Sequence, residues 1–199
     1  MKYINQLDYP HWLYVTRTDM EEEAARERGR TTTVKASGCG MCSAVMVADQ
    51  LLPNCDFELS DAITLSYEVK ANHKRGTDYS RFAPAFAEKL GLRLETSFDV
   101  EDVSRCIHTG GAVVVLVGAH GEGQGLFTRG GHFMAIINQE ADGRFVILDP
   151  SLSPTKYEEP DRKGRVEIKN GVLVLCDPQT LAHEAVINGK VPYYLFWRK

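Results

Sequence analysis

The most informative stretch of the chain runs from Ser37 to Val47 and reads SGCGMCSAVMV. Apolar side chains continue at helical spacing as far as Leu52, and Pro53 stops the pattern, which predicts a helix over 42–52. Cys39 therefore lies at a helix N-terminus, where unpaired backbone N–H groups and the positive end of the helix dipole favour a thiolate. The glycines on either side of it allow a tight turn, and we expect them to leave the sulfur open to a substrate carbonyl. This pattern makes the cysteine a candidate nucleophile.

A cysteine nucleophile needs a base, and the base needs a group that orients it. His132 opens the apolar run HFMAIIN, and Asp149 closes the next run, RFVILD. Asp142 and Gly143, between the two runs, are typical of a hairpin turn. Because side chains alternate along a strand, a loop with an even number of residues puts His132 and Asp149 on one face of the sheet. A loop of about six residues makes them opposite neighbours, one of about four makes them diagonal neighbours, and one of about two sets them too far apart.

The order of patterns along the chain indicates an α+β fold, because helical periodicity dominates the first half and β-branched or aromatic runs dominate the second. We expect N-terminal helices, with the helix of the nucleophile packed on a C-terminal antiparallel β-sheet. No linker composition divides the chain, so residues 1–199 are expected to form one domain. Residues 1–38 are expected to be irregular apart from a short helix over 20–28. The other expected helices cover 61–71, 81–90, 100–109 and 178–186, with N-caps at Ser60, Ser80, Asp99 and Asp177. The expected strands cover 112–118, 132–138, 144–149, 165–169, 172–176 and 193–197.

The composition excludes several classes of protein. Of the 199 residues, 43% are hydrophobic and 25% are charged, which is the balance of a globular protein rather than a disordered chain. No apolar run reaches the length of about 18 residues that a membrane-spanning helix needs. The formal net charge of −4 does not indicate the basic surface of a nucleic-acid-binding protein. Five cysteines without small-domain spacing argue against a disulfide framework, and the lack of an apolar leader predicts a cytoplasmic protein.

Short motifs surround the candidate residues. The stretch Asn5–Tyr9 (NQLDY) precedes Ser37–Gly40 (SGCG) and the apolar stretch Ala44–Val47 (AVMV). Further on, Gly131–Phe133 (GHF) begins one strand and Asp149-Pro150 ends the next. Spread over roughly residues 3–151, these motifs resemble the papain-like cysteine peptidases that process the double-glycine leaders of bacteriocins, a bacterial family with many stand-alone relatives. The resemblance implies a papain-like fold and acyl transfer at a peptide or amide bond, with hydrolysis as the usual outcome.

Carried onto this sequence, the resemblance implies a role for four residues. Cys39 is the implied nucleophile, His132 the general base, and Asp149 the group that orients His132. Gln6 and the backbone N–H of Cys39 are the implied donors to the oxyanion. The implied partner is a peptide or amide substrate, and no cofactor or metal is implied.

The sequence departs from the family's pattern at two points. Met41 and Cys42 stand where the family usually has Pro and then Thr or Ser, and the interval from Gln6 to Cys39 is long, 39 − 6 = 33 residues.

Two other hypotheses fit the same residues. Cys39 and Cys42 form a C-x-x-C at a helix start, which is typical of thiol redox centres, although these also need a preceding strand and a βαβ unit. A zinc site would require further ligands at motif spacing, which the sequence does not offer. The second hypothesis is a non-catalytic papain-like module that binds a peptide in the same groove.

A glycine-rich segment, Gly118–Gly131, leads into His132 and contains six glycines. It is not a phosphate loop, because no helix follows it and no G-K-[S/T] is present. We interpret it as a flexible connection at the rim of the site that closes as a lid.

Overall fold

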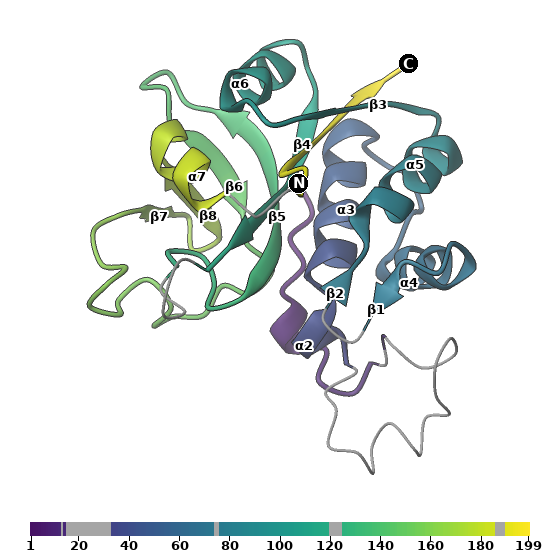
Figure 1. The fold of residues 1–199 in the computed structure, drawn as a ribbon, viewed down its shortest axis with the longest axis horizontal. Coiled ribbons are helices and arrows are strands. Elements are labelled where there is room, and N and C mark those ends of the chain that lie inside the picture. Colours follow the sequence, from purple (N-terminus) through teal and green to yellow (C-terminus); the bar gives the residue numbers. More distant parts are fainter. Residues whose placement is uncertain (13, 15–32, 74–75, 120–124, 186–189) are drawn as a thin grey trace.

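The computed structural model describes residues 1–12, 14, 33–73, 76–119, 125–185 and 190–199. The largest element among these residues is a seven-stranded sheet in which every neighbouring pair is antiparallel (Figure 1). The strands lie in the order β3-β9-β4-β5-β6-β8-β7. Their bounds are Leu92–Ser97 (β3), Ala112–Gly118 (β4), Gly131–Gln139 (β5), Phe145–Leu148 (β6), Glu167–Lys169 (β7), Leu173–Cys176 (β8) and Tyr193–Arg198 (β9). The expected α+β class with an antiparallel sheet is confirmed.

Helix α3 (Cys39–Leu51) packs on one face of this sheet, against β4, β5 and β9 (Figure 1). Its residues are almost all apolar or small, and 11 of its 13 residues are buried, so it is a core helix rather than an amphipathic surface helix. Helices α4 (Leu59–Glu68) and α5 (Tyr79–Leu90) lie against α3, and α5 also packs on the sheet, where the ring of Phe86 contacts that of Phe196 in β9. The expected packing of this helix on the sheet is confirmed.

The two faces of the sheet carry separate apolar clusters, because side chains alternate along each strand. In β5, Phe133 and Ala135 face the cluster that holds α3, whereas Met134 and Ile136 face the other cluster. Helices α6 (Val100–His108) and α7 (Pro178–Glu184) cover that second face. The sheet is therefore buried on both sides.

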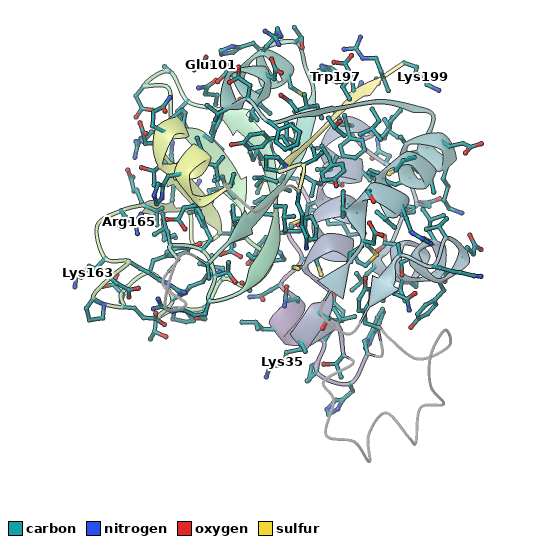
Figure 2. All side chains as sticks on the ribbon, viewed as in Figure 1. Lys35, Glu101, Lys163, Arg165, Trp197 and Lys199 are labelled. Carbon is teal, nitrogen blue, oxygen red and sulfur yellow. The ribbon has the colours of Figure 1, made fainter. Side chains whose placement is uncertain are left out.

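Charged residues such as Lys35, Glu101 and Lys163 are exposed and lie at the periphery of the molecule (Figure 2).

The hairpin of β5 and β6 differs from a regular one in a way that matters for the site. Gln139 pairs with Phe145, which leaves a loop of five residues, 140–144. A loop with an odd number of residues would, by itself, put His132 and Asp149 on opposite faces of the sheet. However, the register shifts by one between Ile136 and Asn138, where the strand bulges. The bulge adds one residue on β5, so the two candidate residues return to one face as diagonal neighbours.

Several helix boundaries differ from the expectations. The N-cap of α4 is Glu58 and that of α5 is Asp78, not Ser60 and Ser80, because these acidic side chains bond the backbone N–H groups of the first turn. The helix of the nucleophile begins at Cys39 itself, three residues earlier than expected. By contrast, Asp99 and Asp177 are N-caps as expected.

Other differences lie in segments that the sequence pattern left unassigned. Within the region expected to be irregular, Gln6–Asp8 forms a short 3-10 helix, η1, and Val34–Ser37 forms helix α2. Strand β3 was not expected, nor was the two-stranded ribbon of β1 (Asn72–His73) and β2 (Gly76–Thr77). The helix expected over 20–28 lies outside the described residues. Within the described part of the chain, no helix combines the length and the apolar character needed to cross a membrane.

Candidate active site

Cys39 is the first residue of α3, directly after the N-cap Gly38. Neither Gly38 nor Gly40 has the positive φ that would require a glycine. A Cβ on Gly38 would lie 2.6 Å from Val34 Cγ1 and 2.8 Å from the Val34 carbonyl oxygen, and one on Gly40 would lie 2.8 Å from Thr77 Oγ1. The glycines therefore let α2 and β2 approach the start of α3 closely. Cys39 itself is 7% exposed, so most of this residue is buried, and it lines a cavity.

His132, the second residue of β5, connects the cysteine to the carboxylate. Its Nε2 lies 2.7 Å from Asp149 Oδ1 and 3.1 Å from Ser151 Oγ. The imidazole also lies close enough to Cys39 for each of the two groups to shift the pKa of the other. Since Nε2 faces the carboxylate, Nδ1 is the nitrogen left for the sulfur. The structure thus brings three of the four candidate residues close together: His132 is hydrogen-bonded to Asp149 and lies beside Cys39.

Asp149 is fully buried and accepts more hydrogen bonds than a triad alone requires. Lys156 Nζ lies 2.5 Å from Asp149 Oδ2, and Tyr157 donates its hydroxyl to the same oxygen at 2.6 Å. Ser151 donates both its backbone N–H (2.9 Å) and its hydroxyl (3.1 Å) to Oδ1, the oxygen that faces His132. The carboxylate is therefore fixed on both oxygens.

Sequence reasoning missed Ser151, Lys156 and Tyr157, which we call the Asp149 cluster. Lys156 is only 8% exposed, and besides Asp149 it bonds Ser151 Oγ at 2.7 Å. The cluster comes from the loop between β6 and β7, where no periodicity marks a side chain as buried. The only available signal is the proximity of these polar residues to Asp149 in the sequence.

The charges at this site shift the proton affinities of its members in a consistent direction. Burial raises the pKa of Asp149, but the charges and hydrogen bonds of His132 and Lys156 outweigh it and hold the pKa well below its ordinary value. Burial lowers the pKa of His132, but Asp149 more than offsets this, so the net shift is upward. For Cys39, burial opposes ionisation, yet the hydrogen bond and charge of His132 lower the pKa of the thiol below its ordinary value. A raised pKa of His132 and a lowered pKa of Cys39 together favour the imidazolium–thiolate pair.

Gln6 occupies η1 and is 6% exposed. Its backbone N–H donates to the carbonyl of Pro150 at 2.6 Å, and its side-chain Nε2 donates to the carbonyl of Lys35 at 2.7 Å. The residue thereby bridges the segment after Asp149 and helix α2, which leads into Cys39. One of the two Nε2 hydrogens is used by Lys35, which leaves the second for another acceptor.

The fold around Cys39 and Cys42 differs from the βαβ unit of a thioredoxin-like redox centre. Cys42 is completely buried, and burial, together with the nearby Cys39, raises its pKa far above the ordinary value. The residues just before Cys39 form helix α2 and not a strand, and the sheet beside α3 is antiparallel, so no βαβ unit surrounds the pair. All five cysteines are free thiols.

The glycine-rich segment is described only in part, since residues 120–124 lie outside the described ranges. The described part is anchored rather than lid-like. Leu126 and Phe127 are buried in the core, and the Leu126 N–H donates to Glu184 Oε2 at 2.8 Å. Gly131, at the end of the segment, lines the cavity beside Cys39, as expected for the rim of the site.

Comparison with known proteins identifies the fold. No protein-family model matches the sequence, and no curated protein matches it. Among solved structures, the crystal structure of a C39-like peptidase from Bacillus anthracis is similar, with a TM-score of 0.53 over 81% of this chain and 88% of that chain. The fold is papain-like. At 13% sequence identity, this similarity concerns the fold alone.

Proposed function

We propose that this protein is a cysteine peptidase or amidase that cleaves a peptide or amide bond through Cys39, His132 and Asp149. One observation supports the proposal: His132 is hydrogen-bonded to Asp149 and lies beside Cys39, which lines a cavity. A nucleophile bonded to a base that is itself oriented by a third group is the arrangement that covalent acyl transfer requires.

In the proposed reaction, the Cys39 thiolate attacks the substrate carbonyl and forms a C–S bond. The backbone N–H of Cys39 and the spare Nε2 hydrogen of Gln6 donate to the oxyanion. The His132 imidazolium then gives its proton to the leaving amine as the C–N bond breaks. Water, deprotonated by His132, hydrolyses the thioester and restores the free thiol. An acyltransferase would use an amine in place of water in this last step.

We also propose that the whole chain, residues 1–199, acts as one domain, since both apolar clusters share the single large sheet. The resemblance of the motifs extends to peptidases of double-glycine leaders.

The experiment that tests the function is alkylation with iodoacetamide at neutral pH, followed by mass spectrometry of each cysteine. We expect Cys39 to react faster than Cys55, the half-buried free cysteine that serves as an internal control. The variant His132→Ala should abolish the difference, because the imidazole favours the thiolate. Equal reactivity of the accessible cysteines in the wild-type protein would instead indicate a peptide-binding module without a catalytic nucleophile.

A second measurement identifies the reaction. A peptide library incubated with the wild-type protein and with Cys39→Ala should give cleavage products only with the former. If the protein is a thiol redox protein, mild oxidation will instead remove about two daltons from the intact mass through a Cys39–Cys42 disulfide.

A further inference from the structure

Ser151 lies in the loop that follows β6, two residues after Asp149, and its side chain contacts three groups of the site at once. Its Oγ lies 3.1 Å from His132 Nε2, 3.1 Å from Asp149 Oδ1 and 2.7 Å from Lys156 Nζ. The backbone N–H of Ser151 also donates to Asp149 Oδ1, at 2.9 Å. The reaction proposed above gives Ser151 no part, although this residue meets the base, its carboxylate and the buried ammonium group.

The hydroxyl of Ser151 has one proton to donate, and its neighbours decide which acceptor receives that proton. The Lys156 ammonium group is a donor only, so it donates to Ser151 Oγ. Because the neighbours of Asp149 keep its carboxylate ionised, the proton in the 2.7 Å contact between Nε2 and Oδ1 belongs to His132. Nε2 is then a donor as well and accepts nothing from Ser151. The hydroxyl proton therefore points to Asp149 Oδ1.

This assignment means that Asp149 Oδ1 accepts three hydrogen bonds, one from His132 Nε2 and two from Ser151. Each donor stabilises the negative charge of a carboxylate. A carboxylate oxygen that is stabilised in this way attracts a further proton less strongly than one with a single donor. The hydroxyl of Ser151 thus competes with the imidazole for the same oxygen.

We propose that Ser151 is a positioning residue for His132, whose hydroxyl shares Asp149 Oδ1 with the imidazole and weakens the hold of the carboxylate on the imidazole proton. This inference rests on the proposed peptidase function and deepens it. In that function His132 takes a proton from Cys39 and later gives it to the leaving amine. An imidazolium that is held too strongly would release this proton slowly, so a competing donor at Oδ1 favours the second transfer.

Other titratable or charged groups also lie around the imidazole and its carboxylate, and the test must hold them constant. Ser151→Ala changes none of them, and it keeps the backbone N–H that bonds Oδ1. The groups concerned are Cys39 at the start of α3, Tyr3 in the N-terminal segment, and Lys156, Tyr157 and Arg162 in the loop after β6.

Ser153 provides a matched control in the same loop. Like Ser151 it is half-buried, and among the residues that the structure describes its hydroxyl bonds none of the site's groups. Ser153→Ala therefore makes the same chemical change two residues away from Ser151. Ser151→Thr is the conservative variant, because it keeps both the hydroxyl and the backbone N–H.

The measurement is the titration of the His132 imidazole by NMR, in protein that carries Cys39→Ala so that no thiol titrates beside it. The variant His132→Gln identifies the resonance among those of the six histidines. We expect Ser151→Ala to raise the pH midpoint of His132 by about 0.5–1, the effect of one hydrogen bond. Ser153→Ala and Ser151→Thr should leave the midpoint where it is with Ser151 in place.

The direction of the change decides the proposal. An unchanged midpoint in Ser151→Ala would overturn it, even if the variant unfolds at lower urea, because the hydroxyl would then serve packing alone. A lowered midpoint would also overturn it, because the Ser151 oxygen would then accept the imidazole proton rather than compete for Oδ1.

A second readout connects the titration with the nucleophile. In protein that retains Cys39, the upper limb of the pH profile of alkylation should move to higher pH in Ser151→Ala, because this limb follows the loss of the imidazolium proton. An upper limb that stays in place would contradict the proposal. Neither readout requires turnover. A peptide library without Cys39-dependent cleavage would therefore count against the peptidase function, whereas the titration would still decide the role of Ser151.

Discussion

Replacing Lys156 by Met removes an ammonium group that lies 2.5 Å from Asp149 Oδ2, and it keeps much of the buried apolar stem. Without this positive charge, nearby protons are held more tightly, so the pKa values of Cys39 and His132 both rise. We therefore expect the pH profile of Cys39 alkylation, and both limbs of any bell-shaped kcat/KM profile, to move to higher pH.

The control for this prediction is Lys156→Arg, which keeps the charge and should leave the profile where it is in the wild-type protein. A profile for Lys156→Met that loses height without moving along the pH axis would show that Lys156 serves packing alone.

Asp149 and Lys156 depend on each other for stability as well. Asp149→Asn leaves the Lys156 ammonium buried without its counter-ion, and such a change costs about 3–5 kcal/mol in the free energy of unfolding. The double variant Asp149→Asn/Lys156→Met should recover most of that loss in urea unfolding, because no unpaired charge remains. It should not recover the reactivity of Cys39, because His132 still lacks its carboxylate. If the double variant is no more stable than Asp149→Asn, the loss does not arise from the stranded charge.

At the scale of single residues, the sequence was sufficient to select the candidate site residues but insufficient to predict which side chains surround them. Cys39, His132 and Asp149 could be selected because a helix start, a strand start and a strand end each carry a local signal. Lys156 and Tyr157 carry no such signal, because charged and aromatic residues in a loop are buried only through contacts that the whole chain determines.

At the scale of elements, the junction of α2 and α3 positions the nucleophile. Gly38→Ala should cost about 1–3 kcal/mol in urea unfolding and reduce the alkylation rate of Cys39, because the new Cβ would lie 2.8 Å from the Val34 carbonyl oxygen. The second variant Gly38→Ala/Val34→Ala removes the clash with Val34 Cγ1 but not the one with the backbone. It should therefore stay slow in alkylation, and recovery of the rate would mean that the backbone contact is unimportant.

The predictability of the elements followed the strength of their local signals. Asp99 and Asp177 begin their helices as expected, and α5 ends at Leu90 as expected, where the C-cap Gly91 has a positive φ of 65°, as helix-terminating glycines often do. Strand β3 was missed because it is an edge strand with one buried residue, and its pairing with β9 joins parts of the chain about 100 residues apart. The bulge in β5 was equally invisible, because register depends on the partner strand.

At the scale of the whole molecule, the buried carboxylate makes stability depend on pH. The pKa of Asp149 is lower in the folded protein than its ordinary value of 3.8, so the folded state binds fewer protons than the unfolded state. Its contribution to stability is complete above that value and is lost as the pH falls below it. We expect the urea midpoint of the wild-type protein to fall between about pH 5 and pH 3 more steeply than that of Asp149→Asn/Lys156→Met. Parallel curves would contradict an ionised Asp149 in the fold.

The fold as a whole was predictable to the level of its layers and not to the level of its strand order. Helical periodicity identified α3, and β-branched or aromatic runs identified six of the sheet strands from sequence. The position of β9 between β3 and β4 has no counterpart in local periodicity, since it depends on pairing with two strands that are distant in the sequence.

The pairing of Lys156 with Asp149 also bears on the response of the protein to salt. These two buried charges cancel, and a proton that moves from Cys39 to His132 creates a second pair that cancels as well. The interior thus holds no net charge before or after the transfer. Dissolved ions act mainly on exposed charges and on fields that extend into the solvent. Formation of the thiolate should therefore be almost indifferent to ionic strength, whereas the surface pairs of the same molecule weaken as salt is added.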